Sequence, residues 1–356
     1  MQSGRKPTRS WMSEIIRVLV VDDSAYVRKV VSAMLSRSPF IEVVGTARDG
    51  DEALERAAEL KPDVITCDLN MPVMDGVAFV REQMRRWPVP IVILSIAAES
   101  AEQVLAALDA GAVDFVQKPT ALATERLMDM ADEVVQKVKT AARVGLARRL
   151  RVATATARPA PSPDRAPSAV EVVVLGISTG GPQGLKRLIP ALPKDFRVPI
   201  AMVMHMPLGY TEMYAAKLNE MSALSVVEAR EGDEVRAGTV YLAPAGRHLV
   251  FRRNRTGITT GLDLTPLDTA HRPSVDVLFQ SAAQTFGSGV LGVVMTGMGS
   301  DGREGAGWIK SRGGNILAEA EESCVVYGMP RAVVEAGLAD EVVPLDGMAA
   351  AIMERV

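Results

Sequence analysis

Cysteine, aromatic residues and long apolar runs are scarce in this chain of 356 residues. The two cysteines, Cys67 and Cys324, each lie beside apolar residues, and neither belongs to a pair with metal-binding spacing. We expect both to be small buried side chains in a reducing compartment, which argues against a disulfide scaffold or a cysteine-ligated metal. Aromatic residues form only 4% of the chain, so no aromatic stripe for peptide binding is evident.

Membrane and nucleic-acid proteins are also disfavoured. No apolar run reaches the ~18–20 residues that a membrane helix requires, so no direct membrane insertion is expected. Residues 1–14 are predicted to be an extension; they are basic and lack the apolar core of a signal peptide, which favours a cytoplasmic protein. A formal net charge of −3 and a pI near 5.8 give no electrostatic reason to expect nucleic acid as a partner.

Residues 15–140 alternate between short apolar runs and segments with helical periodicity. Such alternation predicts an α/β domain in which crossover helices connect the strands of a parallel sheet. Five repeats of this unit correspond to one doubly wound (βα)5 domain of the flavodoxin-like kind. The expected strands are Ile16–Val21, Ile41–Gly45, Val64–Cys67, Ile91–Ser95 and Val113–Gln117.

Residues 141–169 are predicted to be a linker. They contain the end of a helix and then a segment rich in alanine, proline and serine, which cannot bury enough apolar surface to fold. The alternation resumes in residues 170–356, where we expect a larger α/β domain with a doubly wound, mostly parallel sheet. Its predicted strands are Val172–Gly176, Ile200–Met204, Thr239–Ala243, Gly289–Met295, Asn315–Glu319 and Glu341–Pro344.

Acidic side chains follow two strands of the first predicted sheet. Asp22 and Asp23 follow one strand and Asp68 another, and residues at the carboxyl ends of parallel strands converge on one crevice. Converging carboxylates repel one another, and a hard divalent cation such as Mg²⁺ relieves the repulsion. Because Ser95 and Lys118 end two further strands, the set predicts a site for a phosphoryl group. For any single position, an aspartate that caps a helix is the alternative.

These residues resemble the response-regulator receiver family over residues 16–138. The resemblance rests on the Asp22-Asp23 pair, the segment DLNMPVMDG, Ser95 and the pair Lys118-Pro119 in the family's order. It implies that Asp68 is the phospho-acceptor. It further implies Mg²⁺ ligands from Asp22, Asp23, Asp68 and the backbone carbonyl of Asn70, and phosphoryl contacts from Ser95 and Lys118.

A serine follows the first strand of the second predicted domain. Ser178 lies in GISTGGPQG, where the glycines permit a tight turn from strand to helix. Such a turn exposes the hydroxyl at a helix N-terminus, where free backbone N–H groups favour developing negative charge. The segment also fits the G-x-S-x-G pattern of a nucleophile elbow, so Ser178 is the predicted nucleophile.

A nucleophilic serine needs a base, and the chain has three histidines. His205 ends the apolar run PIAMVMH and is expected on the same edge of the sheet as Ser178. His248 opens the run HLVF, which predicts the opposite edge, and His271 is expected to begin a helix. His205 is therefore the predicted base, with a merely structural histidine as the alternative.

The base needs an orienting carboxylate. Asp301 follows a strand that runs into the glycine-rich turn TGMGSDG, which delivers it to the same edge of the sheet. Asp263 and Asp276 are rivals, although neither follows a strand as cleanly. Asp301 is therefore the predicted orienting acid.

A nucleotide site is the rival interpretation of the same turn. The residues from Gly297 to Gly302 fit G-x-G-x-x-G after a strand, with Glu319 and Glu321 further on, as in a dinucleotide fingerprint. That assignment leaves GISTGG and His205 without a function, so we favour the hydrolase.

The order serine, histidine, aspartate differs from that of α/β-hydrolases, in which the acid precedes the histidine. From the strand VVVLG to its end the chain resembles the catalytic domain of the chemotaxis protein-glutamate methylesterases, the CheB family. The resemblance rests on GISTGG, YLAPAGRH, HRPSVDVLF, TGMGSDG and VVYGMPRAV. It implies a nucleophile Ser178, a base His205, an orienting Asp301 and an oxyanion hole from the Met298 N–H with Thr179 as a helper.

The implied reaction is hydrolysis of glutamate γ-methyl esters on chemoreceptors, with release of methanol, for sensory adaptation in chemotaxis. Deamidation of receptor glutamines is implied as well. The receiver would take phosphate from a sensor histidine kinase of the chemotaxis type, and no cofactor is expected in the catalytic domain. The alternatives are receptors of an array that does not govern motility, or a second domain that only binds a partner.

Overall fold

The structure is a computed structural model that describes residues 15–96, 101–118, 124–150, 170–255 and 257–356. The chain divides into two compact units, with the main change from the first to the second near residue 151. Within the described residues, no helix combines the length and the apolar character needed to cross a bilayer.

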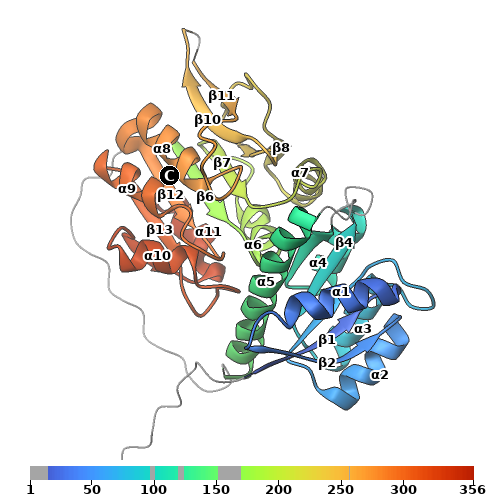
Figure 1. Cartoon of the computed structure of the whole chain (residues 1–356). Helices are drawn as coiled ribbons and strands as arrows, with labels where there is room; N and C mark the ends of the chain where they lie inside the picture. The colour runs from blue at the N-terminus through green and yellow to red at the C-terminus, as the bar shows by residue number, and fades with distance from the viewer. Residues whose placement is uncertain (1–14, 97–100, 119–123, 151–169, 256) are drawn as a thin grey trace, which may run out of the picture. The chain divides into compact units, whose positions relative to one another are not determined.

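The first unit is a parallel sheet with the strand order β2-β1-β3-β4-β5, and its helices connect successive strands (Figure 1). The strands are β1 (Ile16–Val21), β2 (Ile41–Ala47), β3 (Val64–Cys67), β4 (Ile91–Ile96) and β5 (Asp114–Lys118). The helices that follow these strands along the sequence are α1 (Ala25–Leu35), α2 (Gly50–Leu60), α3 (Gly76–Arg86), α4 (Ala101–Ala110) and α5 (Thr124–Leu150), although residues 101–109 of α4 group with the second unit.

Local signals explain where these elements begin. All four residues of β3 are buried, as are the last four of β1, because helices cover both faces of a parallel sheet. Asp49 and Asp75 accept hydrogen bonds from the backbone N–H groups of Glu52 and Ala78, and so cap α2 and α3. The strand order reverses between β1 and β3, which makes the carboxyl ends of these strands the expected ligand site.

The second unit contains a seven-stranded parallel sheet with the order β14-β13-β12-β6-β7-β9-β8. Its strands are β6 (Val172–Ile177), β7 (Ile200–Met204), β8 (Ser225–Glu228), β9 (Thr239–Leu242), β12 (Val290–Val294), β13 (Asn315–Glu319) and β14 (Glu341–Val343). Its helices are α6 (Gly181–Leu188), α7 (Thr211–Met221), α8 (Val275–Phe286), α9 (Arg303–Ser311), α10 (Met329–Glu335) and α11 (Leu345–Met353). Here the strand order reverses between β6 and β12.

The predicted α/β class with mostly parallel sheets is confirmed for both units. Two strands were not predicted, β8 and β11 (Ile258–Asp263). The strand β10 (His248–Arg253) contains the run HLVF, but it pairs with β11 in an antiparallel hairpin, a separate ribbon in Figure 1, and not with the main sheet. The four residues of β8 lie at the edge of the sheet and are only partly buried. The hairpin strands pair with each other, and β11 carries two threonines and a glycine, so it does not form a continuous apolar run.

Candidate active site

Three strand ends at the centre of the large sheet carry the residues predicted to catalyse. Ser178 follows β6, and its N–H donates to the carbonyl of Thr296 beyond β12, with an N···O distance of 2.9 Å. His205 follows β7, and its N–H donates to the carbonyl of Ile177 at 3.3 Å. Asp301 lies in the turn between β12 and α9. Because β12, β6 and β7 are parallel neighbours, all three residues lie at one edge, beside the point where the strand order reverses.

The backbone around Ser178 forms a tight turn into α6. Gly180 has a φ of +82°, and a Cβ on it would lie 2.5 Å from the side chain of Val325, so glycine is required there. The hydroxyl of Thr296 donates to the carbonyl of Thr179 at 3.0 Å. These contacts fix the serine turn to the loop after β12, as a preorganised nucleophile requires.

The buried carboxylate of Glu319 holds the loop after β12 in place. Glu319 has no exposed surface, and its oxygens accept hydrogen bonds from the N–H of Thr296 and the hydroxyl of Ser323, each at 2.9 Å. Glu319 is therefore buried and bonded to the protein itself, which does not fit an acid that binds a ribose hydroxyl. The arrangement therefore argues against the dinucleotide interpretation of the turn after β12.

Asp301 joins His205 to the start of α8. Its Oδ2 lies 2.8 Å from Nε2 of His205 and accepts from the N–H of Val275 at 2.9 Å. Its Oδ1 accepts from the hydroxyl of Ser274 and the N–H of Asp276, both at 2.9 Å. The carboxylate thus occupies the N-terminus of α8, where free N–H groups and the helix dipole favour negative charge.

The pKa of the Asp301 carboxyl lies below its ordinary value. Burial alone would raise this pKa, but the hydrogen bond and charge of His205 lower it, and the N–H groups of Asp276 and Val275 add to that effect. Asp301 is therefore ionised at neutral pH and can stabilise a positive charge on the His205 ring.

The other nitrogen of His205 is available for proton transfer. Among the described residues, the buried Nδ1 atom has no hydrogen-bond partner. In the neutral imidazole whose Nε2–H donates to Asp301, Nδ1 carries the lone pair. No hydrogen bond joins Ser178 Oγ to His205 within the described part of the chain. Such bonds are often long without substrate and tighten in the Michaelis complex.

The rival carboxylates have other partners. Asp263 pairs with Arg252 on the surface hairpin. Asp276 accepts from the N–H groups of Gly302 and Gly305 at 2.9 and 2.7 Å and so holds the start of α9. Burial and the neighbouring charge of Asp301 raise the pKa of the Asp276 carboxyl to about 6. Neither rival has a hydrogen bond to His205 among the described contacts.

The predicted oxyanion donors lie on the two loops that meet at Ser178. Gly297 directly precedes Met298, and a Cβ on Gly297 would lie 2.9 Å from the Cβ of Ser178. The Gly297 carbonyl accepts from the N–H groups of Gly328 and Met329 at 3.1 and 2.9 Å, which fixes this backbone. The close approach brings the Met298 segment beside the serine, as an oxyanion hole requires.

Two histidine expectations were wrong. His248 does not lie at the opposite edge, because its Nδ1 accepts from the N–H of Ser274, whose hydroxyl contacts Asp301. It begins β10 of the hairpin rather than a strand of the main sheet, so the rule for parallel strand ends does not apply to it. His271 does not begin a helix either; it precedes α8, and its ring stacks on His205 with centroids 4.0 Å apart.

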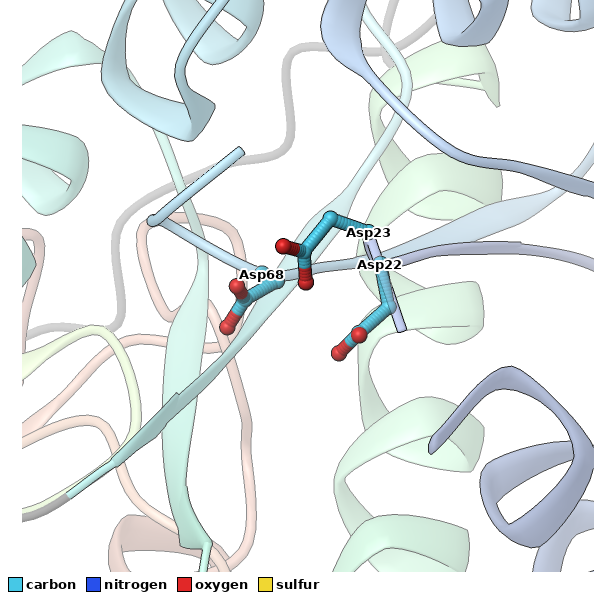
Figure 2. Close-up of side chains that lie close together, drawn as sticks. All are labelled: Asp22, Asp23 and Asp68. Atoms are coloured by element: carbon cyan, nitrogen blue, oxygen red, sulfur yellow. The ribbon is translucent and has the colours of Figure 1, made fainter. Parts of the chain in front are cut away.

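In the first unit, three carboxylates gather at the ends of β1 and β3. Figure 2 shows the side chains of Asp22, Asp23 and Asp68 close together. One ligand oxygen from each lies within 4.8 Å of the others. The ammonium of Lys118, at the end of β5, donates to Asp22 at 2.5 Å and to Asp68 at 2.7 Å. Ser95 at β4 is buried. The structure thus brings the acidic residues and the lysine together as predicted.

The charge balance of this cluster fits a divalent cation. Burial raises the pKa of the Asp68 carboxyl, and Asp22 adds to the rise, although Lys118 opposes it. Three carboxylates face one ammonium, so negative charge is in excess in a partly buried site. Oxygen donors in this arrangement suit Mg²⁺ with water in its remaining positions.

Comparison with known proteins assigns the family. Residues 173–352 match the family described as CheB methylesterase, and residues 18–132 match the response regulator receiver domain. A curated relative from Myxococcus xanthus, named protein-glutamate methylesterase/protein-glutamine glutaminase 5, is 52% identical over 348 residues, which cover 96% of this chain and 98% of the relative. The chain belongs to the CheB methylesterase family.

Other members of the CheB family agree. A protein-glutamate methylesterase/protein-glutamine glutaminase of Halalkalibacterium halodurans is 43% identical, over 97% of this chain and 99% of the relative. The crystal structure of the CheB methylesterase catalytic domain of Thermotoga maritima is 42% identical, with a TM-score of 0.52 over 53% of this chain and all of that domain. The predicted family and the predicted enzyme class, a carboxylic ester hydrolase with a receiver domain, are thereby confirmed.

Proposed function

We propose that Ser178, His205 and Asp301 form the catalytic triad of this CheB-family hydrolase. The observation that carries the proposal is the state of His205, whose Nε2 is held by Asp301 while its Nδ1 stays unpartnered among the described residues. The serine follows the neighbouring strand, in a turn fixed to the loop after β12. This arrangement has the three functions that nucleophilic hydrolysis needs.

In the proposed reaction, Ser178 Oγ attacks the carbonyl carbon of a glutamate γ-methyl ester, and His205 Nδ1 takes its proton. The tetrahedral oxyanion is stabilised by the N–H of Met298, with Thr179 as a helper. His205 returns the proton to the leaving oxygen, methanol departs, and an acyl-enzyme remains. Water then attacks with His205 as base and frees Ser178 and the glutamate. With a glutamine substrate, ammonia leaves instead.

The proposed substrates are methylated glutamates and certain glutamines of chemoreceptors. The relatives' names contain both activities, protein-glutamate methylesterase and protein-glutamine glutaminase. The receptor assignment rests on the family resemblance, and a cytoplasmic location is proposed on the same ground.

The first unit is proposed to receive phosphate on Asp68 from a sensor histidine kinase of the chemotaxis type. Mg²⁺ would be held by Asp22, Asp23, Asp68 and the backbone carbonyl of Asn70, and when bound it neutralises charge on the phosphoryl oxygens. Lys118, which already contacts Asp68, and Ser95 would contact the same oxygens. Phosphorylation would then control the hydrolase.

The proposed domain limits follow the sequence and the family matches. Residues 15–140 are assigned to the receiver, residues 141–169 to a linker and residues 170–356 to the catalytic domain. The matched ranges 18–132 and 173–352 lie inside the two domains.

Methanol release from methylated receptor fragments tests the proposal. Purified full-length protein should release methanol, and a small phosphoryl donor with Mg²⁺ should increase the rate. Glutamate should appear at receptor glutamine positions in the same reaction, as mass spectrometry would show. Release of methanol without any response to the donor would support the hydrolase and contradict its control by the receiver.

A further inference from the structure

His248 is a buried histidine to which the proposed mechanism gives no role. It begins β10 and has no exposed surface. Its Nδ1 accepts from the N–H of Ser274 at 3.2 Å, and its Nε2 lies 3.1 Å from the carbonyl oxygen of Pro266 and 3.4 Å from the hydroxyl of Thr269. Both ring nitrogens therefore have partners on the segment that leads into α8.

These partners determine the protonation state of the ring. A backbone N–H can only donate, so Nδ1 must carry a lone pair, and a carbonyl can only accept, so Nε2 must carry the proton. His248 is accordingly neutral. Burial lowers the pKa of the His248 imidazole, and Arg272 adds to the decrease, against the raising effects of the Pro266 carbonyl, Asp301 and Asp263.

The contact with Ser274 leads directly to the orienting carboxylate. The Ser274 hydroxyl donates to Oδ1 of Asp301, and the next two N–H groups, those of Val275 and Asp276, donate to the same carboxylate. Three of the hydrogen bonds that hold Asp301 therefore come from the turn that His248 anchors. The fourth links Asp301 to His205.

We infer that His248 is a positioning residue for the proposed triad, and that it acts by fixing the Ser274 turn that holds Asp301 against His205. The inference rests on the proposed function, because it assigns Asp301 the orienting role. Ser274 is buried, so without the imidazole its N–H would lose a partner that water cannot easily replace. The turn would then shift, and misplacement of about 1 Å in a catalytic group can cost 10²-fold in rate.

Two substitutions test the contacts of the two His248 ring nitrogens, Nδ1 and Nε2, one at a time. In His248→Asn, the side-chain oxygen can take the place of Nδ1 and accept from Ser274, while the contact with Pro266 is lost. In His248→Gln, the amide nitrogen can take the place of Nε2 and donate to Pro266, while Ser274 loses its acceptor. A purely structural role would make the two variants similar, whereas a positioning role makes them different.

The experiment compares the variants in the full-length protein with a phosphoryl donor and Mg²⁺. His248→Gln should lower kcat for methanol release about 10-fold to 100-fold, and His248→Asn should stay within about 3-fold of the wild type. The proton NMR signal of the His205 N–H bonded to Asp301 should move in His248→Gln and be retained in His248→Asn. Equal kcat in the two variants, or an unmoved signal in His248→Gln, overturns the inference.

Ser274→Ala provides a second, milder variant if His248→Gln does not fold. It removes only the hydroxyl donor to Asp301, so it should lower kcat and shift the same NMR signal. Where both variants fold, their effects should not add in the double variant, because they act on one turn. Fully additive effects, or an unchanged kcat in Ser274→Ala, contradict the inference. A Ser178→Ala protein that still released methanol would instead refute the triad itself, so the two failures are distinguishable.

Discussion

The two units both place carboxylates where the strand order of a parallel sheet reverses, but they satisfy these carboxylates in opposite ways. In the second unit, Asp301 accepts hydrogen bonds from His205, Ser274, Val275 and Asp276. In the first unit, Asp22, Asp23 and Asp68 lie close together, and the ammonium of Lys118 donates to Asp22 and Asp68. The pKa of Asp301 is lowered and that of Asp68 is raised.

The two sites therefore differ in what balances the negative charge of their carboxylates. In the second unit, hydrogen-bond donors of the protein do so, whereas the first unit leaves room for a bound cation to do so. The donors around Asp301 supply the positive potential that a carboxylate needs, so the protein itself holds this carboxylate in place. The cluster around Asp68 keeps an excess of negative charge, which is the state expected of a site that binds Mg²⁺ and then a phosphoryl group.

The largest effect is expected at Ser178. Ser178→Ala should lower kcat for methanol release by at least about 10⁴-fold, because members of a catalytic triad act as a unit. The melting temperature should stay close to that of the wild type, since one small turn residue replaces another. Ser311→Ala, at an exposed serine on α9, is the matched control and should retain activity. Comparable rates in the two variants would remove Ser178 from the mechanism.

The second-largest decrease in kcat is expected from a change of Asp301. Asp301→Asn should lower kcat about 10³-fold to 10⁴-fold, because the amide no longer stabilises the protonated His205 ring. Asp263→Asn changes a rival carboxylate that pairs with Arg252 on the surface, and it should change kcat by less than about 2-fold. Single-turnover assays of both variants provide the measurement. The reverse order of effects would make Asp263 the orienting acid.

The cluster of Asp22, Asp23 and Asp68 should differ from the hydrolase site because its phosphorylation should require a divalent cation. Chelation of Mg²⁺ should lower phosphorylation of Asp68 by a small phosphoryl donor about 100-fold or more, since a metal supplies several kcal/mol to such a step. Methanol release without donor should be unaffected by chelation. Asp68→Asn should abolish labelling, while Asp51→Asn, at an exposed aspartate of α2, should not. Labelling of Asp68 that persists without Mg²⁺ would contradict the claim that this site depends on a bound cation.

The smallest effect concerns the stability contributed by Asp276. Its pKa is raised from 3.8 to about 6, so its contribution to stability is full below pH 3.8 and is lost as the pH rises through about 6. Asp276→Asn keeps an oxygen for the N–H groups of Gly302 and Gly305 but does not titrate. Urea unfolding should show it gaining stability relative to the wild type between pH 4 and pH 7, by about 1 kcal/mol after solvent screening. Asp346→Asn, exposed on α11, should show no such trend.

The positions of Ser178, His205 and Asp301 were predictable because strand ends of a parallel sheet share an edge. Apolar runs identify β6, β7 and β12; Ser178 and His205 directly follow the first two runs, and Asp301 lies in the turn after the third, so all three fall at that edge. The same reasoning predicted the clustering of Asp22 with Asp68. The rule is local to each strand, so it needs no knowledge of tertiary contacts.

The contacts of His248 could not be predicted in this way. The hairpin that carries it is outside the parallel sheet, and its contact with Ser274 joins residues 26 positions apart through tertiary packing. The stacking of His271 on His205 has the same origin. The pattern HLVF indicates a strand but does not show with which strand it pairs, so the predicted edge was wrong.

Covalent labelling of the nucleophile tests the central claim that the second unit is a complete hydrolase site centred on Ser178. The full-length protein is treated with a reactive phosphonate ester in the presence of a metal chelator, and the labelled residue is found by peptide mass spectrometry. We predict one label, on Ser178, at a rate that chelation does not change and that Asp301→Asn lowers. A label on another residue, or labelling that requires Mg²⁺, would contradict the account.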